Sequence, residues 1–203
     1  MEGELPLLTL VPLWLGLVFA IGINSYVVVF GSGLILRWGG VVLGADRLGA
    51  LAAPPVLGIA LIGLLLEWSV GKSRAYGSLW DALHAPIRPL VAAAISALLF
   101  ADFGWTYRLL LAMVGAGVAF LVHSTKASVR FAAAGAPDGR WLLAVSLGEE
   151  LTAAALLILA WFRPTETLVT VGIGGLAIGM MLPRVLCALM RAAERTLTQL
   201  LSR

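Results

Sequence analysis

Long runs of apolar residues, separated by short polar or basic segments, dominate this chain. An α-helix needs about 20 mainly apolar residues to cross the hydrocarbon core of a bilayer. Six windows of this kind follow one another along the chain, so the pattern predicts an all-α, polytopic bundle of about six transmembrane helices in a single domain. The predicted spans cover residues 7–36, 48–70, 87–103, 107–129, 141–162 and 167–187.

Two of the predicted spans are irregular. The first run is too long for one upright helix that rises about 1.5 Å per residue, and residues 22–25 read Gly-Ile-Asn-Ser. We expect this run to tilt, bend or break there. Pro86 and Pro89 fall at the start of the third span, and proline removes a helical hydrogen bond. This predicts a broken helix, with a short amphipathic or re-entrant helix at about residues 78–86 ahead of the third span.

The composition agrees with a lipid environment. Hydrophobic residues make up 61% of the chain and charged residues 12%, whereas soluble domains carry about 25% charged residues. The net charge of +3 is spread between apolar runs and forms no basic stripe, which argues against nucleic acid as a partner. Cys187 is the only cysteine, so an internal disulfide is excluded. No Lys or Arg precedes the first apolar run, so we expect a retained segment and no cleaved signal peptide.

The basic residues predict an orientation. With six spans, both termini lie on one side with the loops after spans two and four, and the positive-inside rule assigns the more basic side to the cytoplasm. Lys72, Arg74 and Arg140 belong to that side. We therefore expect a multi-pass protein of the cytoplasmic (inner) membrane with both termini in the cytoplasm. The tail at 184–203 is predicted to be an amphipathic cytoplasmic helix, read either as a lipid-attracted surface or as a basic stop-transfer flank.

The two halves of the chain are weakly similar. When residues 7–103 are compared with 107–187, aligning Arg37 with Arg130 also brings Gly22 onto Gly115. Three-plus-three inverted repeats are typical of secondary transporters. An inverted repeat is therefore one interpretation, and chance resemblance between glycine-rich apolar helices is the other.

Charged residues inside the apolar runs are the main candidates for function. An ionisable side chain at the centre of a spanning helix costs roughly 2.5–3.5 kcal/mol on insertion scales, and Glu149 and Glu150 lie well inside the fifth span. On the preceding span His123, Lys126 and Arg130 recur at helical spacing, so they share one face. We predict an ion pair between Lys126 and one of the two glutamates. Such a pair could serve a substrate or only hold two helices together.

Further polar residues are predicted to converge on the cytoplasmic side. Residues 67–88 contribute several of them, although a solvated loop is the alternative there, and the first span contributes two beside its glycines, where helix packing is the alternative. The candidate substrate- or ion-binding residues are Asn24, Ser25, Glu67, Asp81, His84, Arg88, His123, Lys126, Glu149 and Glu150.

These residues favour a transporter or a lipid-headgroup flippase, with a cytoplasm-facing polar pocket for a small charged or anionic substrate. The expected partners are membrane lipid and a small charged solute or lipid headgroup, and homo-oligomer formation stays open. No cofactor or metal is expected. One alternative is a structural or assembly protein whose charges only pair helices. Another is an intramembrane metal-dependent hydrolase that uses the two glutamates with His84 and His123.

Three stretches carry a resemblance to a known family. They are Gly-Ile-Asn-Ser-Tyr at 22–26, the stretch from Ser-Leu-Trp-Asp-Ala at 78–82 to Ile-Arg-Pro at 87–89, and the stretch from His-Ser-Thr-Lys at 123–126 to Arg130. The chain resembles a family of small polytopic membrane proteins, from bacteria and plants, known only as a domain of unknown function. The resemblance implies an acidic position in the fifth span, where Glu149 and Glu150 stand, and it implies no activity.

Overall fold

The computed structural model describes residues 7–39, 45–70, 73, 76–135 and 140–201. Within these ranges the chain forms helices and no strands, which confirms the predicted all-α class. The elements are α1 (Leu7–Ile23), α2 (Ser25–Trp38), α3 (Ala45–Leu48), the 3-10 helix η1 (Gly49–Ala52), α4 (Pro54–Ser69), α5 (Gly77–Leu99), α6 (Trp105–Ala134), α7 (Arg140–Phe162) and α8 (Pro164–Leu201).

The protein is an integral membrane helix bundle. Four segments of the described chain are long and apolar enough to cross a bilayer, namely α5, α6, α7 and the Pro164–Met181 part of α8. Shorter apolar helices are formed by α1, α2 and α4. The 16 residues of α4 span about 24 Å at 1.5 Å per residue, slightly less than the hydrocarbon core of about 30 Å.

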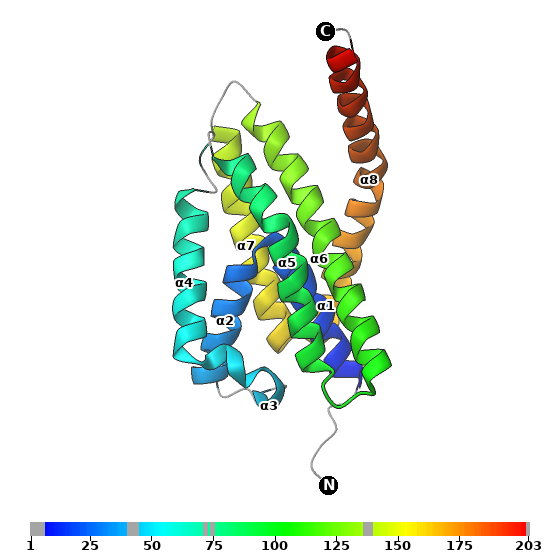
Figure 1. Ribbon diagram of the computed structural model, residues 1–203. Coiled ribbons are helices and arrows are strands. Elements are labelled where there is room, and N and C mark those ends of the chain that lie inside the picture. The colour runs from blue at the N-terminus through cyan, green and yellow to red at the C-terminus, as the bar shows by residue number, and fades with distance from the viewer. Residues whose placement is uncertain (1–6, 40–44, 71–72, 74–75, 136–139, 202–203) are drawn as a thin grey trace.

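Aromatic side chains mark both ends of the bundle. Exposed Trp68, Tyr76 and Trp141 belong to the end of α4 and the starts of α5 and α7, which lie together at the upper end in Figure 1. Exposed Trp38 and Trp105 belong to the end of α2 and the start of α6, at the lower end. Exposed Leu, Ile and Val side chains cover the helices between these ends. Two aromatic belts around an apolar band are typical of a membrane-spanning bundle.

The first apolar run forms a re-entrant hairpin. Helix α1 rises from the lower end and stops inside the bundle, and α2 returns to the lower end (Figure 1). Asn24 breaks the helix with an extended backbone, at φ −152° and ψ 102°. Its side-chain oxygen accepts hydrogen bonds from the backbone N–H groups of Tyr26 and Val27, each at 3.1 Å, as an N-cap residue does. The predicted irregularity at residues 22–25 is confirmed, and it is a reversal of direction.

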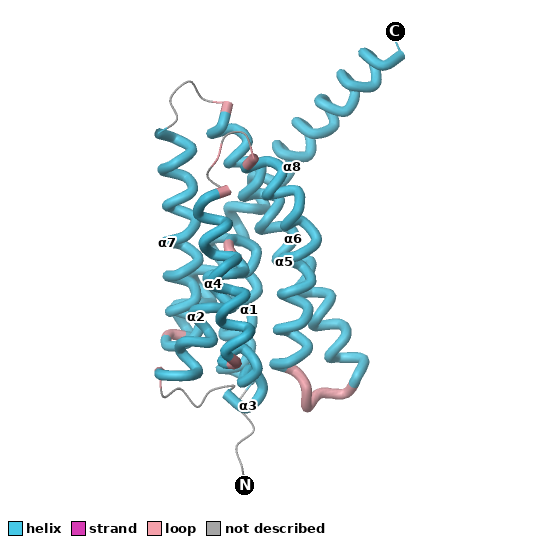
Figure 2. Tube along the Cα trace, turned by 60° about the vertical axis from the view of Figure 1, so that its left-hand side comes forward, coloured by secondary structure: helices cyan, strands magenta, loops and turns pink. Residues whose placement is uncertain are grey.

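This hairpin changes the predicted topology. Residues 7–36 do not cross the bundle, and helices α4 to α8 alternate in direction (Figure 1). Helix α8 therefore ends at the end of the bundle opposite the start of α1 (Figures 1 and 2). The arrangement therefore differs from the predicted one, in which both termini share a side. The predicted internal repeat is not confirmed: it would match the broken hairpin of α1 and α2 to residues 107–131, which belong to one continuous helix, α6.

Two further boundaries differ from the predictions. Helix α5 runs without interruption through Pro86 and Pro89, so the predicted short helix at 78–86 and span at 87–103 form one element. A proline is tolerated there because neighbouring helices in a membrane bundle compensate for the lost hydrogen bond, and α5 packs along α6. Helix α8 continues through Pro183 to Leu201. The side chains of 184–201 and all of residues 202–203 lie outside the described part, so the amphipathic tail stays a prediction.

Helix α1 forms the centre of the bundle, with α5, α6, α7 and α8 packed around it. Leu13, Leu17 and Ile21 are completely buried. The Nε1–H group of Trp14 donates to Ser96 Oγ at 2.7 Å, which satisfies a buried polar group within this apolar centre. The helix that leads to the apex of the hairpin is therefore buried over most of its length.

Candidate functional site

The C-terminal end of α1 meets two buried cations. Arg88 of α5 is completely buried, and its Nη1 atom donates to the carbonyl oxygens of Gly22 at 3.0 Å and Ile23 at 2.7 Å. Lys126 of α6 donates from Nζ to the Ile23 oxygen at 2.8 Å. The last carbonyls of a helix lack helical partners and carry the negative end of its dipole. The two cations therefore stabilise a helix end that would otherwise be unsatisfied inside the membrane.

Glu67 of α4 joins the same two cations. Its Oε1 atom lies 2.8 Å from Arg88 Nη2 and 3.1 Å from Lys126 Nζ, and the residue is only 4% exposed. Asp81, His84 and Arg88 are buried as well. The alternative of a solvated loop for residues 67–88 is therefore wrong for these four charged and polar side chains.

A second set of ion pairs continues from Lys126 along α6. Lys126 Nζ lies 3.4 Å from Glu149 Oε2, so the predicted contact between α6 and α7 is present. Arg130, one turn further along α6, lies 3.4 Å from Asp81 Oδ1 and 3.9 Å from Glu149 Oε2. Arg130 was not among the candidate site residues, although its position four residues after Lys126 places both on one face.

The two histidines are fixed by their partners. A guanidinium can only donate, so Arg88 Nη1 donates to His123 Nδ1 at 2.9 Å, sharing its two hydrogens among this nitrogen and the two α1 carbonyls. His123 Nε2 donates to the Asp81 carbonyl at 2.9 Å. His123 is therefore a neutral imidazole with its proton on Nε2. His84 donates from Nδ1 to the Trp80 carbonyl, and its Nε2 lies 2.8 Å from the Tyr26 hydroxyl. Sequence reasoning missed Tyr26, although it follows Asn24 and Ser25 directly.

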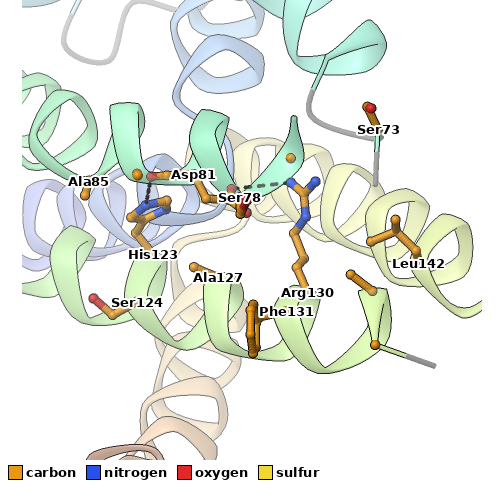
Figure 3. Close-up of a pocket in the computed structure, with 14 residues that line it drawn as sticks. Ser73, Ser78, Asp81, Ala85, His123, Ser124, Ala127, Arg130, Phe131 and Leu142 are labelled. Carbon is orange, nitrogen blue, oxygen red and sulfur yellow. Dashed lines mark hydrogen bonds and ion pairs between the residues drawn. The ribbon is translucent and has the colours of Figure 1, made fainter. Parts of the chain in front are cut away.

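A cavity of about 560 Å³ lies beside this network, between the first half of α5 and the second half of α6. Asp81, His123 and Arg130 form its polar part, and Figure 3 shows Arg130 reaching from α6 towards Asp81 on α5. The other side chains are mostly small or apolar. The lining residues are Ser73, Gly77, Ser78, Asp81, Ala82, Ala85, His123, Ser124, Ala127, Arg130, Phe131, Ala134, Gly135 and Leu142.

A second, much smaller cavity lies at the apex of the hairpin. It is lined by Asn24, Glu67, Lys126, Arg130, Ser146, Glu149 and Glu150. Seven of the ten candidate residues line one of the two cavities, and Arg88 is hydrogen-bonded to two of these seven, Glu67 and His123. His84 lines neither cavity and is bonded to Tyr26 and to the Trp80 carbonyl. Ser25 also lies apart, because it is buried and lines a separate apolar pocket with Tyr26 and Ile87.

The part of the chain that the structure describes holds no group of three or more His, Cys, Asp or Glu residues placed to hold a metal. Both ring nitrogens of His84 and of His123 are engaged by hydrogen bonds. This leaves the hydrolase alternative without a ligand set among the described residues.

Comparison with known proteins gives a family and no activity. No curated protein and no solved structure matches the chain. One family model, described as a domain of unknown function, matches residues 11–184. That range includes the hairpin from residue 11 onwards, both cavities and every residue of the charged network. The chain therefore belongs to the family of the domain of unknown function DUF4126.

Proposed function

We propose that the protein is a membrane transporter or lipid-headgroup flippase that binds a small anionic group, either free or as a lipid headgroup, in the cavity between α5 and α6. The observation that carries this proposal is the position of Arg130. It lines the cavity and is almost completely buried, and its two carboxylate partners lie at 3.4 and 3.9 Å. Tight charge-assisted hydrogen bonds measure about 2.7–2.9 Å, so these loose pairs leave room for an anion to compete.

The cavity has the chemistry of an amphiphile site. His123 and Arg130 offer polar contacts in its wall, while Ala127, Phe131 and Leu142 offer apolar ones. Phe131 is 77% exposed on the outer surface of α6. A headgroup bound at Arg130 could therefore have its acyl chains beside Phe131, and a small solute would use only the polar part.

The broken hairpin supports transport. Secondary transporters place their sites at interrupted helices whose ends face the substrate or a coupling ion, and irregular backbone in a membrane is tolerated where it is buried or lines a cavity. Here the interruption at Asn24 lies beside Lys126 and Glu149. Rocking of α5 and α6 against the hairpin would change access to the cavity.

The basic residues support a revised orientation in the cytoplasmic membrane. Lys72 and Arg74 fall between α4 and α5 in the sequence, and Arg140 begins α7. The ends of these helices lie at the upper end of the bundle, where α8 also finishes (Figure 1). By the positive-inside rule the upper end faces the cytoplasm. The C-terminal end of α8 is then cytoplasmic, and α1 begins on the opposite side.

A structural or assembly role is the second candidate, and two observations favour it. Arg88, Lys126 and Arg130 each have a carboxylate within 4 Å. Holding the hairpin in place is therefore enough to account for the network. In addition, Gly175 and Gly179 of α8 are exposed, and no atom lies within 4 Å of a Cβ built on either. Small residues at this spacing are typical of helix contacts in membranes, including contacts between two copies.

The test is transport by the purified protein in liposomes, with fluorescent anionic lipids and a panel of small anions. We expect Arg130→Gln to reduce the rate about tenfold or more, equivalent to about 1.4 kcal/mol, when it is measured at a temperature at which the variant and the wild type are both fully folded. Arg163→Gln is the control, because Arg163 is largely exposed at the other end of the bundle. The proposal would be overturned if no lipid or anion of the panel were transported, or if the Arg130→Gln variant transported as fast as the wild type. Loss of stability in parallel with activity would favour the structural role.

A further inference from the structure

Arg130 keeps part of its hydrogen-bonding capacity unused in the wall of the larger cavity. It is only 4% exposed, and its Nε atom is buried without a hydrogen-bond partner. Its Nη1 atom lies 3.4 Å from Asp81 Oδ1 and 3.9 Å from Glu149 Oε2, which are long contacts between a guanidinium and a carboxylate. Buried polar groups usually have partners, so these contacts indicate that a ligand with an anionic group completes the site.

Asp81 limits which anions the cavity can accept. Its carboxylate is almost completely buried, and it lines the cavity together with Arg130 (Figure 3). A bare anion that takes over the Arg130 guanidinium leaves the Asp81 carboxylate without the cation that faces it. A buried charge that loses its partner is strongly unfavourable. A ligand that carries only negative charge therefore binds at a penalty.

The ion pairs that the structure describes around Asp81 are balanced in charge. They join three cations to three carboxylates, namely Arg88, Lys126 and Arg130 to Glu67, Asp81 and Glu149. An added anion would give this group a net negative charge in a low-dielectric environment, where charges interact strongly. Glu150 in the small cavity adds no cation to the balance. A ligand with one negative and one positive charge preserves it.

The larger cavity lies at the depth of lipid headgroups. Two of its lining residues, Gly77 and Leu142, directly follow the exposed aromatic residues Tyr76 and Trp141 of the upper belt. Aromatic belts lie at the membrane–water interface. Asp81 is four residues further along α5 than Gly77, or about 6 Å at 1.5 Å per residue. The charged part of the cavity is therefore just inside the interface, where a headgroup can reach it.

The cavity suits a primary ammonium better than a quaternary one. The Asp81 carboxylate can accept hydrogen bonds from a primary ammonium. A quaternary ammonium has no N–H group and is typically bound in a cage of aromatic side chains. Phe131 is the only aromatic side chain among the described residues that line the cavity, and it is exposed on the outer surface of α6. It is placed to contact acyl chains instead.

We propose that the cavity binds a lipid whose headgroup combines a phosphate with a primary ammonium, as in phosphatidylethanolamine. The phosphate contacts Arg130, the ammonium contacts Asp81, and the acyl chains leave the cavity beside Phe131. The pair between Arg130 and Asp81 is thus exchanged for two pairs with the ligand, and no charge is left unpaired. This inference rests on the proposed function for the location of the site, and it narrows the ligand from an anionic group in general to a zwitterionic lipid.

Native mass spectrometry of the purified protein in detergent tests the headgroup directly. The protein is mixed with equal amounts of phosphatidylethanolamine, phosphatidylcholine and phosphatidylglycerol that carry the same acyl chains. We expect the first lipid to bind at least about tenfold more tightly than the other two, because a hydrogen bond to a charged group contributes more than the about 1.4 kcal/mol that corresponds to a factor of ten. Glycerophosphoethanolamine, which lacks acyl chains, should displace it only weakly.

Asp81→Asn should change the selectivity. The variant lacks the negative charge that faces the ammonium, so we expect the preference for phosphatidylethanolamine over phosphatidylglycerol to be lost or reversed. Asp102→Asn is the matched control, because the Asp102 side chain is 68% exposed in the connection between α5 and α6, at the lower end of the bundle (Figure 1). This variant should keep the preference of the wild type.

Equal binding of the three lipids, tighter binding of phosphatidylcholine or phosphatidylglycerol, or an unchanged preference in a folded Asp81→Asn variant would overturn the proposal. Glycerophosphoethanolamine that competes as well as the lipid would identify a soluble zwitterion as the ligand and would also overturn it. If Asp81→Asn does not fold, the comparison of the three lipids on the wild type and on Asp102→Asn still decides.

The binding measurement separates this inference from the proposed function. Selective binding of phosphatidylethanolamine by a protein that transports none of the tested lipids or anions would support the inference and refute the transport role. Transport of lipids or small anions, without a preference for phosphatidylethanolamine in the binding experiment, would support the transport role and overturn the inference.

Discussion

Arg88 Nη2 and Glu67 Oε1 lie 2.8 Å apart, with both side chains at most 5% exposed. This ion pair links α5 to α4, and the same guanidinium holds the carbonyl end of α1. One arginine thus connects a spanning helix, a shorter outer helix and the re-entrant hairpin. Its main structural effect is to keep the hairpin apex inside the membrane.

Removal of Arg88 should therefore destabilise the protein strongly. Breaking a buried ion pair by removing one partner costs about 3–5 kcal/mol, and Arg88→Ala also leaves the Gly22 carbonyl without its donor. Thermal or denaturant unfolding in detergent measures the loss. Arg163→Ala is the control, because an exposed pair contributes about 0–1 kcal/mol. Equal stability of the two variants would contradict the role assigned to Arg88.

Exchange of the charges of Lys126 and Glu149 tests whether these two residues form an isolated ion pair or are also coupled to Glu67. A simple pair would recover fully in the double variant Lys126→Glu/Glu149→Lys. Lys126 also lies 3.1 Å from Glu67, so a glutamate at position 126 would face another carboxylate. We expect partial recovery, with an interaction energy of about 0.5–3 kcal/mol between the two positions, measured by unfolding of the two single variants and the double variant. Full recovery would show that Glu67 is not coupled to this pair.

The sequence predicted the helices of this fold better than their directions. Apolar runs identify which segments lie in the membrane, and the glycines and Asn24 mark the break in the first run. Hydropathy carries no information on whether a chain continues or reverses at a break. The hairpin depends on long-range contacts instead, such as the one between Arg88 and Gly22, 66 residues apart. The same limit applies to Pro86 and Pro89, whose effect depends on the helix packed against them.

The charged network was predicted where local spacing determines it. Helical spacing places His123, Lys126 and Arg130 on one face, and a short connection makes α6 and α7 neighbours. The contact between Lys126 and Glu149 could be predicted from these two facts. The contact of Tyr26 with His84 joins residues 58 positions apart and has no local signal. The same is true of Glu67, whose two cations come from different helices.

We expect the chain to cross the membrane an odd number of times, because the hairpin returns to the end where it starts and only α4 to α8 run from one end to the other (Figure 1). We expect a reporter fused ahead of α1 and one fused after α8 to lie on opposite sides of the membrane, with the second in the cytoplasm. A single cysteine introduced at Thr106, which is exposed near the lower end of α6, should react with an impermeant thiol reagent from outside. The background is Cys187→Ser, which removes the only native cysteine. Both reporters on one side would show that residues 7–36 cross the membrane once.

The hairpin packs closely against α6 at Gly22, so we expect a larger side chain there to destabilise the protein. Gly117 of α6 is the matched control. A Cβ atom added to Gly22 would lie 2.6 Å from Val122 Cβ and 2.8 Å from the Ala119 carbonyl oxygen, whereas no atom lies within 4 Å of a Cβ on Gly117. Overpacking of this kind costs about 1–3 kcal/mol, because backbone on α6 or on the hairpin must shift. Gly117→Ala should be neutral or stabilising by up to about 1 kcal/mol, since alanine is the better helix former. Unfolding of both variants in detergent measures the difference, and a Gly22→Ala variant as stable as Gly117→Ala would show that the apex does not pack against α6.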